Sequence, residues 1–182
     1  MIKLSDYNIE LHLIRHGKYE PTKIGGWSDD HLSQDGIFEV EELLNQIDKD
    51  YDVFYSSDLN RAKDTALIIN KKLNTNIVFD SNLREFDSGI FNLMTIEEYQ
   101  KSKIKMSINS MDDRFPEGES FNMFFERINK EFVHILETNR DKKILMVTHG
   151  GVITCILCLL NDYEYNPSLN IGPKTGSILK LK

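Results

Sequence analysis

The chain has 182 residues, 40% of them hydrophobic, which suits a single domain over residues 1–182 with a buried core. Its formal net charge of −7 argues against a general nucleic-acid-binding surface, so an anion site would have to be a local basic pocket. No apolar run reaches the roughly 18 residues of a membrane span, and residues 1–8 lack the apolar core of a signal peptide. We therefore expect a cytoplasmic protein without nucleic-acid or membrane partners, and the sequence leaves a homodimer open.

The first predicted element is a strand over residues 9–14, an apolar run interrupted by Glu10 and His12. It is followed by Arg15, His16 and Gly17. Open α/β sheets bind ligands at the carboxyl ends of their strands. An arginine beside a histidine at such an end offers a fixed cation and a nucleophile or base, which suits phosphate chemistry. The alternative is an exposed Arg-His pair in a loop.

The rest of the chain alternates between helical and strand patterns. Residues 17–32 form a loop whose length is typical of functional loops. After it we expect helices over about 33–48, from Ser57 or Asp58 to 73, over 95–103, from Glu119 or Ser120 to 139, and from Gly150 onward. Strands are expected at 52–56, 76–79, 143–147 and 177–181. This alternation predicts an α/β fold with a mostly parallel sheet covered by helices on both faces.

Polar side chains follow three of these strands. Arg15 and His16 end the first, Ser56 and Ser57 lead from the second toward Arg61, and His149 ends the fourth. If these strands are parallel neighbours, their carboxyl ends converge on one crevice. The sequence thus places two arginines and two histidines in one candidate site.

These residue types suit phosphoryl transfer. Arg15 and Arg61 can clamp phosphate oxygens with their planar guanidinium groups. His16 is the expected nucleophile, because a neutral imidazole nitrogen can attack phosphorus and nearby arginines favour its neutral form. His149 would donate a hydrogen bond to a phosphate oxygen. Both residues have a structural alternative. Arg61 could lie on a solvated helix face, and His149 could cap a helix or be a core histidine.

A leaving alcohol also needs a proton, and the irregular stretch 83–89 offers Glu85 and Asp87. We expect Glu85 to be the general acid that later activates water, although it could be a surface carboxylate. Gly150, at the start of the last helix, permits close approach of backbone N–H groups to an anion.

Two spacings resemble metal motifs and are interpreted otherwise. Cys155 and Cys158 lie in an apolar run without a second CxxC pair, which indicates a buried helix. His12 and His16 are four residues apart, but they lie in a strand pattern and without the glutamate of an HExxH site. We expect no metal and no cofactor.

Six segments in this order resemble motifs of the histidine phosphatase superfamily, in its phosphoglycerate-mutase-like branch. They cover nearly the whole chain: Leu13-Ile14-Arg15-His16-Gly17, Gly26-Trp27-Ser28-Asp29 with Leu32-Ser33 and Gly36, Tyr55 to Ala66, Leu83-Arg84-Glu85 with Gly89, Gly118-Glu119-Ser120, and Thr148-His149-Gly150-Gly151. The resemblance implies a three-layer α/β/α sandwich and a phosphorylated His16. It also implies a phosphate pocket of Arg15, Arg61 and His149, with Glu85 as proton donor and no metal.

Three departures from the family pattern concern substrate contacts. Tyr19 stands where the family often has a small hydroxyl residue, and Asn92-Leu93 stand where Glu-Gly is common. Thr22 stands where Asn is common, and its hydroxyl is expected to bind phosphate with altered reach.

The segment near 95–118 and the loop 17–32 are expected to act as lids over a deep pocket. Family mutases carry longer insertions with additional cations, whereas this segment is short and has four: Lys101, Lys103, Lys105 and Arg114. Its lysines more simply form a solvated face. We therefore expect a phosphatase of a small phosphorylated metabolite, resembling the α-ribazole-phosphate or broad-specificity members. The alternatives are a phosphoglycerate mutase, a non-catalytic phospholigand-binding domain and a protein phosphatase with an open cleft.

Overall fold

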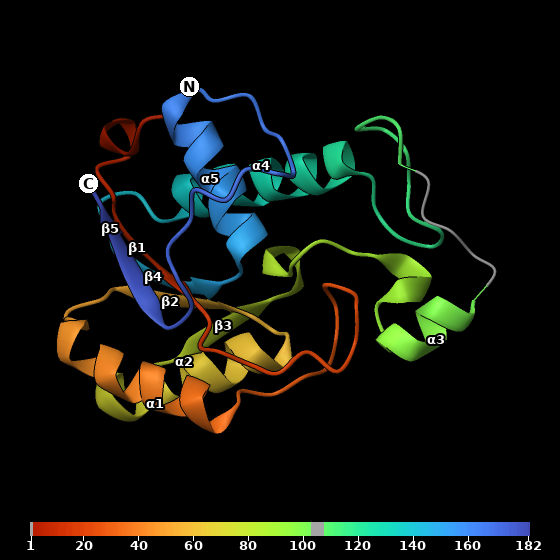
Figure 1. Cartoon of the computed structure of the whole chain (residues 1–182). Helices are drawn as coiled ribbons and strands as arrows, with labels where there is room; N and C mark the ends of the chain where they lie inside the picture. The colour runs from red at the N-terminus through yellow and green to blue at the C-terminus, as the bar shows by residue number, and fades with distance from the viewer. Residues whose placement is uncertain (1, 103–107) are drawn as a thin grey trace.

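A five-stranded sheet forms the centre of the computed structural model, which describes residues 2–102 and 108–182 (Figure 1). Its strands are β1 (Glu10–Arg15), β2 (Val53–Ser57), β3 (Ile77–Asp80), β4 (Lys143–Thr148) and β5 (Ser177–Leu181). Their order is β3-β2-β4-β1-β5, and only the β1–β5 pairing is antiparallel. The central place of the apolar β4 and the edge position of β5 agree with the sequence prediction.

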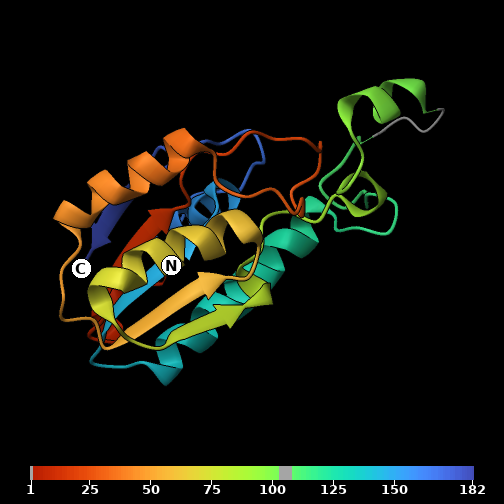
Figure 2. The same cartoon turned by 90° about the horizontal axis from the view of Figure 1, so that it is seen from below.

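Helices cover both faces of the sheet, which confirms the three-layer α/β/α prediction. Figure 2 shows α1 (Gln34–Leu43) and α2 (Asn60–Leu73) on one face, and α4 (Phe121–Thr138) on the other, where α5 (Gly150–Asn161) packs against α4. The short α3 (Ile96–Lys101) stands beyond the carboxyl ends of the strands in both views. Single 3-10 turns occur at Leu4–Asp6, Leu44–Gln46, Ser81–Leu83 and Gly89–Phe91.

The alternation of side chains along the strands creates two cores. Leu11 and Leu13 of β1 face the α4–α5 layer, where they pack in a cluster with Phe132. Ile14 faces the opposite layer, in a cluster with Phe54 and helices α1 and α2. Because both faces of the central strands are buried, the carboxyl edge of the sheet is a rigid platform for the residues that follow each strand.

The helix starts agree with the sequence except at α2. Ser33 caps α1 and Ser120 caps α4, each by accepting a backbone N–H with its hydroxyl oxygen. The predicted caps of α2 are wrong, because the helix begins at Asn60 and the preceding Leu59 offers no side-chain cap. Other partners account for the two polar candidates: Asp58 pairs with Arg84, and Ser57 contacts His149.

Helix α5 is apolar around most of its circumference and carries both cysteines. Cys155 and Cys158 are buried and free, as the sequence indicated. Burial raises the pKa of both thiols, which keeps them protonated and inert. In the described part of the chain, no helix has the length and apolar character needed to cross a bilayer.

Candidate active site

The carboxyl ends of β1, β2 and β4 meet at one edge of the sheet. His16 follows β1 and His149 follows β4, and these two strands are paired with Arg15 opposite Thr148. The centroids of the two imidazole rings lie 5.1 Å apart. Arg61 projects from the first turn of α2, after β2, and its charge acts on both histidines. Parallel pairing of strands distant in sequence thus gathers these groups.

His16 is held as a neutral imidazole with one free nitrogen. Its side chain is 4% exposed, and Nδ1 lies 2.9 Å from the carbonyl oxygen of Gly17. Because a carbonyl can only accept, the proton is on Nδ1 and the lone pair is on Nε2. Burial, followed by the charges of Arg61 and Arg15, lowers the pKa of His16 to about 3. An unprotonated imidazole is the nucleophilic form.

Arg61 is a buried cation without a carboxylate partner. The residue is 1% exposed, and its guanidinium donates to the carbonyls of Gly26 at 2.6 Å and Ser28 at 3.3 Å. Among the ion pairs of residues 2–102 and 108–182, none involves Arg61. Burial lowers the pKa of this guanidinium. A buried charge is costly unless it is paired, so this position calls for an anion.

Three buried nitrogens beside His16 lack a hydrogen-bond partner: Nε of Arg15, Nε of Arg61 and Nδ1 of His149. Buried polar atoms are nearly always paired, so such a set indicates a missing ligand. An anion with several oxygens, such as a phosphoryl group, would satisfy all three. The arrangement therefore fits phosphate.

His149 is oriented by a residue that the sequence analysis did not assign to the site. Its Nε2 lies 2.8 Å from Oγ of Ser57, which also accepts the N–H of Leu59 at 3.3 Å. We assign the Ser57 hydroxyl as donor to Nε2, which places the His149 proton on Nδ1, the nitrogen without a partner. Burial, then the charge of Arg61, holds the pKa of His149 well below its usual range.

Thr65 is a second residue that sequence reasoning missed. Its hydroxyl oxygen accepts the N–H of Gly17 at 3.0 Å and donates to the carbonyl of Arg61 at 2.8 Å. It thereby joins the turn after His16 to the helix that carries Arg61. Its position four residues after Arg61, on the same helix face, was the available signal.

Glu85 lies against the first turn of α5. Its Oε2 accepts the N–H of Gly151 at 2.9 Å, and its Oε1 accepts the N–H of Phe86 at 3.0 Å. The other candidate, Asp87, accepts the N–H of Gly89 at 2.8 Å and the side-chain amide of Asn92. Asp87 is therefore engaged in shaping its own loop, whereas Glu85 is directed toward the helix that follows His149.

The remaining candidates, Gly150, Thr22 and Tyr19, differ in whether they contact the groups around His16. A Cβ atom at Gly150 would lie 3.0 Å from Cζ of Arg15, so glycine allows the guanidinium to approach the backbone there. Thr22 is engaged elsewhere, since its hydroxyl donates to Asp30 at 2.6 Å. The Tyr19 ring lies 5.4 Å from the His16 ring and 4.9 Å from Cζ of Arg61, where it covers both groups.

The loop over residues 17–32 is anchored to the site by Trp27. Its indole N–H donates to the carbonyl of Glu85 at 2.6 Å, and Cζ of Arg84 stacks 4.7 Å from its ring centroid. Its backbone N–H donates to Oδ1 of Asn92 at 3.1 Å. These contacts make Trp27 the anchor of the loop.

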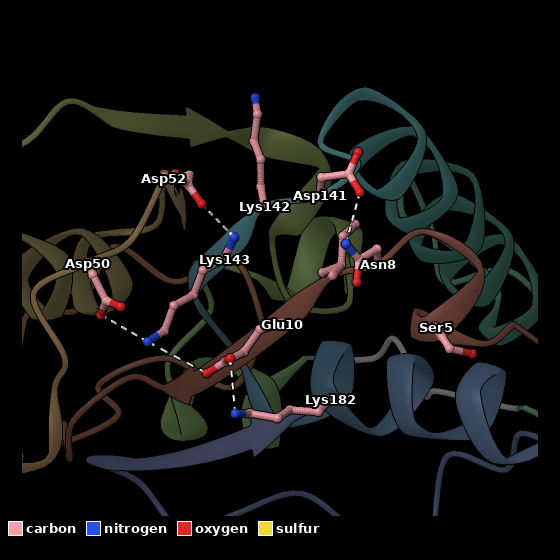
Figure 3. A pocket seen from close by; sticks show the side chains of 10 residues that line it. Ser5, Asn8, Glu10, Asp50, Asp52, Asp141, Lys142, Lys143 and Lys182 are labelled. Carbon is pink, nitrogen blue, oxygen red and sulfur yellow. Dashed lines mark hydrogen bonds and ion pairs between the residues drawn. The ribbon is translucent and has the colours of Figure 1, made fainter.

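A separate cluster of possible metal ligands lies near the amino ends of the strands. Atoms of Glu10, His12 and Asp48 lie within 4.8 Å of one another. Lysines already pair with both carboxylates: Lys143 lies 2.8 Å from Asp48, and Lys182 lies 3.2 Å from Glu10, as Figure 3 shows for the latter pair. His16 is not part of this cluster.

Comparisons with known proteins agree with this geometry. The family profile of the histidine phosphatase superfamily (branch 1) matches residues 11–182. A probable phosphoglycerate mutase GpmB of Citrobacter koseri is 30% identical, over 91% of this chain and 89% of its own. Phosphoserine phosphatase of Entamoeba histolytica, solved with 3-phosphoglyceric acid, is 28% identical with a TM-score of 0.69, over 94% of this chain and 89% of its own. A phosphoglycerate mutase structure from Bacillus anthracis is 25% identical with a TM-score of 0.73, over 94% of this chain and 86% of its own.

The matched region includes every strand and helix that contributes to the site. It contains the neutral His16, the unpaired arginine and His149 nitrogens, and Glu85 at the start of α5. The chain belongs to the histidine phosphatase superfamily, branch 1.

Proposed function

We propose that this protein is a metal-independent phosphomonoesterase that hydrolyses a small phosphorylated metabolite through a phosphohistidine at His16. One observation carries the proposal. A neutral, buried His16 is surrounded by three unpaired nitrogens, from Arg15, Arg61 and His149. Such a set of donors stabilises the charge on the peripheral oxygens of a transferring phosphoryl group.

In the first step Nε2 of His16 attacks phosphorus, and the bond from phosphorus to the leaving oxygen breaks. The carboxyl group of Glu85 gives its proton to that oxygen, so an alcohol departs. In the second step the Glu85 carboxylate takes a proton from water. The water oxygen attacks phosphorus, the phosphorus–nitrogen bond breaks, and inorganic phosphate leaves with His16 neutral again.

The cations of the segment near 95–118 favour a phosphatase over a mutase. Lys101 is exposed and pairs with Glu97, and Arg114 donates to the carbonyl of Gly118. Lys103 and Lys105 lie outside the described residues. The two described cations thus have partners on their own segment. Mutase activity remains the second candidate, because a relative that is 30% identical is named a probable phosphoglycerate mutase.

The first test is hydrolysis of p-nitrophenyl phosphate in the presence of a chelator. We expect turnover by the wild type and a loss of more than about 1,000-fold in His16→Ala, as when a covalent nucleophile is removed. His134→Ala changes an exposed histidine on α4 and should retain full activity. Acid quenching should trap an acid-labile, alkali-stable phosphoenzyme in the wild type but not in His16→Ala.

Other outcomes would contradict the proposal in distinct ways. Hydrolysis that survives in His16→Ala would refute the phosphohistidine. Interconversion of 2- and 3-phosphoglycerate faster than release of phosphate would establish the mutase. Binding of phosphate without turnover of either kind would establish a non-catalytic binding domain.

A further inference from the structure

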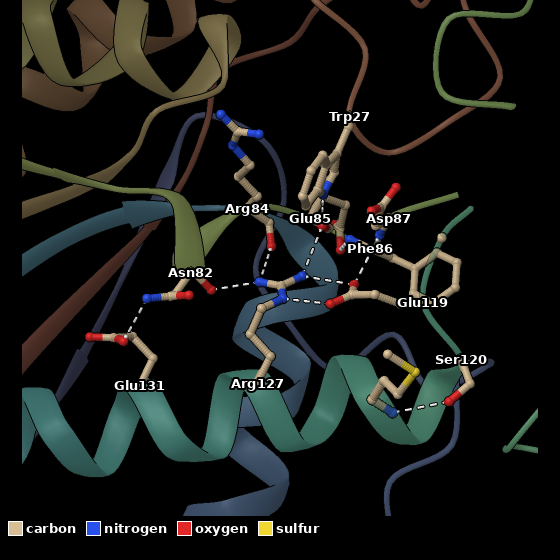
Figure 4. Close-up of polar contacts among 12 residues, drawn as sticks. Trp27, Asn82, Arg84, Glu85, Phe86, Asp87, Glu119, Ser120, Arg127 and Glu131 are labelled. Atoms are coloured by element: carbon tan, nitrogen blue, oxygen red, sulfur yellow. Dashed lines mark hydrogen bonds and ion pairs between the residues drawn. The ribbon is translucent and has the colours of Figure 1, made fainter. Parts of the chain in front are cut away.

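Arg127, on the inner side of α4, uses every donor of its guanidinium on Glu119 and on the segment that carries Glu85. Nε and one N–H of Nη2 bind the two carboxylate oxygens of Glu119, at 2.6 and 2.9 Å. The Nη2 nitrogen also donates to the carbonyl of Glu85 at 3.2 Å. Nη1 donates to the carbonyls of Asn82 at 2.6 Å and Arg84 at 3.1 Å (Figure 4). A guanidinium has five N–H groups, and all five are satisfied here.

Glu119 holds the same segment on the other side of Glu85. Its Oε2 accepts the N–H of Asp87 at 3.1 Å, and its own N–H donates to the carbonyl of Asp87 at 3.0 Å. Glu119 immediately precedes Ser120, the N-cap of α4, so its position is fixed by the start of that helix. The Glu119–Arg127 pair therefore fastens the backbone from Asn82 to Asp87 to a long, regular element.

The pair is largely shielded from solvent, with side-chain exposures of 17% for Arg127 and 12% for Glu119. A bidentate pair in such a position has a defined geometry, unlike the mobile ion pairs of an exposed surface. The segment that it holds has no regular structure apart from the 3-10 turn at Ser81–Leu83. Its conformation thus depends on contacts of this kind.

Neither member of the pair touches the Glu85 carboxylate. That group is bound by the N–H groups of Phe86 and Gly151, and Arg127 reaches only the carbonyl of Glu85, which it shares with the indole of Trp27. An effect of Arg127 on proton transfer would therefore pass through the backbone. General acid catalysis depends steeply on such positioning, because a displacement of about 1 Å can cost about 100-fold in rate.

We propose that Glu119 and Arg127 are positioning residues that aim Glu85 at the leaving-group oxygen. The proposal deepens the phosphatase mechanism and rests on it. A purely structural pair would also hold α4 to the sheet, so the test has to separate proton delivery from general stability. Leaving-group acidity provides that separation: phenol, with a pKa of about 10, needs a proton as it leaves, whereas the more acidic p-nitrophenol departs as its anion.

The experiment compares phenyl phosphate with p-nitrophenyl phosphate, two esters of nearly the same shape, in three variants. Arg127→Lys keeps the charge but loses the planar fork, and Glu119→Gln keeps the shape but loses the charge. Arg140→Lys is the control, because this exposed arginine donates to the carbonyl of Asp6 on another part of the fold. Glu85→Gln gives the effect expected when the acid itself is lost.

We expect kcat for phenyl phosphate to fall about 10- to 100-fold in Arg127→Lys and Glu119→Gln. We expect at most about a threefold fall for p-nitrophenyl phosphate, with KM nearly unchanged for both esters. Arg140→Lys should match the wild type. In Glu85→Gln the addition of Arg127→Lys should cost nothing further, since both changes remove the same proton transfer.

Equal losses with the two esters, or additive losses in the double variant, would overturn the proposal. If Arg127→Lys fails to fold by circular dichroism, the near-isosteric Glu119→Gln decides alone. Absence of His16-dependent hydrolysis in the wild type would instead refute the phosphatase mechanism, and this positioning role with it. The two failures are therefore distinguishable.

Discussion

Gly151 allows the first turn of α5 to come into contact with the carboxylate of Glu85. A Cβ atom there would lie 2.2 Å from Oε1 of Glu85, although the N–H of the same residue binds Oε2 at 2.9 Å. The colliding atom is the end of a flexible side chain, so a larger residue would displace the carboxylate rather than the helix. The requirement for glycine at this position is thus one of space beside Glu85.

Gly151→Ala should lower kcat for phenyl phosphate by about 10- to 100-fold, because the carboxylate moves away from the reacting atoms. Stability should change little, since alanine favours helix by up to about 1 kcal/mol over glycine. Steady-state kinetics and urea unfolding measure the two quantities. The control is Gly172→Ala, where the nearest atom, Cγ2 of Ile153, is 3.4 Å from the added Cβ. Equal activities of the two variants would contradict the prediction.

Among the individual residues of the site, those that directly follow a strand could be predicted from the sequence. Arg15, His16 and His149 were placed together because parallel strands end at one edge. Ser57 and Thr65 were not assigned to the site, because a serine after a strand and a threonine in a helix have many ordinary uses. Arg127 gave no signal either, since three of its hydrogen bonds go to backbone carbonyls of a segment without periodicity.

The loop over residues 17–32 links the substrate site to the single tryptophan of the chain. Arg61 donates to the carbonyls of Gly26 and Ser28, which flank Trp27, and its unpaired Nε is available to an anion. The loop therefore connects a group that can bind an anion with the backbone of Glu85 and the side chain of Asn92, both of which hold Trp27.

Orthovanadate, a phosphate mimic, should therefore produce a saturable change in Trp27 fluorescence at the concentrations that inhibit hydrolysis. The change reports on this loop alone, since the chain has one tryptophan. Arg61→Gln removes the charge that binds the anion and should abolish both the inhibition and the signal. Inhibition of the wild type with no change in emission would show that the loop does not respond to the occupied site.

Element boundaries were predictable where apolar and polar side chains follow a regular pattern or a helix has a capping hydroxyl. Periodicity located all five strands, and the caps Ser33 and Ser120 were visible in the sequence. The stretch from Glu85 to Asn92 was not predictable beyond its irregularity. Its backbone groups bind side chains that come from other parts of the chain, among them Glu119 and Arg127.

For the whole molecule, the buried neutral histidines make stability depend on pH. The pKa of His16 is about 3 in the folded chain and near 6.5 when the chain is unfolded, and the pKa of His149 is also well below its usual value. Between these values the unfolded chain binds protons that the folded chain does not. The contribution of the two neutral histidines to the free energy of unfolding is fully present above pH 6.5 and is lost as the pH falls toward 3.

We expect the free energy of unfolding, measured by urea titration in phosphate-free buffer, to fall from pH 6.5 to 4.5. His16 alone contributes about 1.4 kcal/mol per pH unit, so His16→Asn should flatten the slope by about that amount. His134→Asn, at an exposed position, should leave the slope unchanged. Identical slopes in His16→Asn and the wild type would contradict a neutral buried imidazole.

The pairing of β1 has a consequence for the order of events during synthesis. Residues 10–15 leave the ribosome long before their two neighbours in the sheet, at 143–148 and 177–181. The N–H of Gly176 also binds the carbonyls of Arg15 and His16, each at 3.1 Å. His16 is thus translated well before the segments that fix its position, and the nascent chain has to keep an apolar strand from aggregating until residues 143–181 have been made.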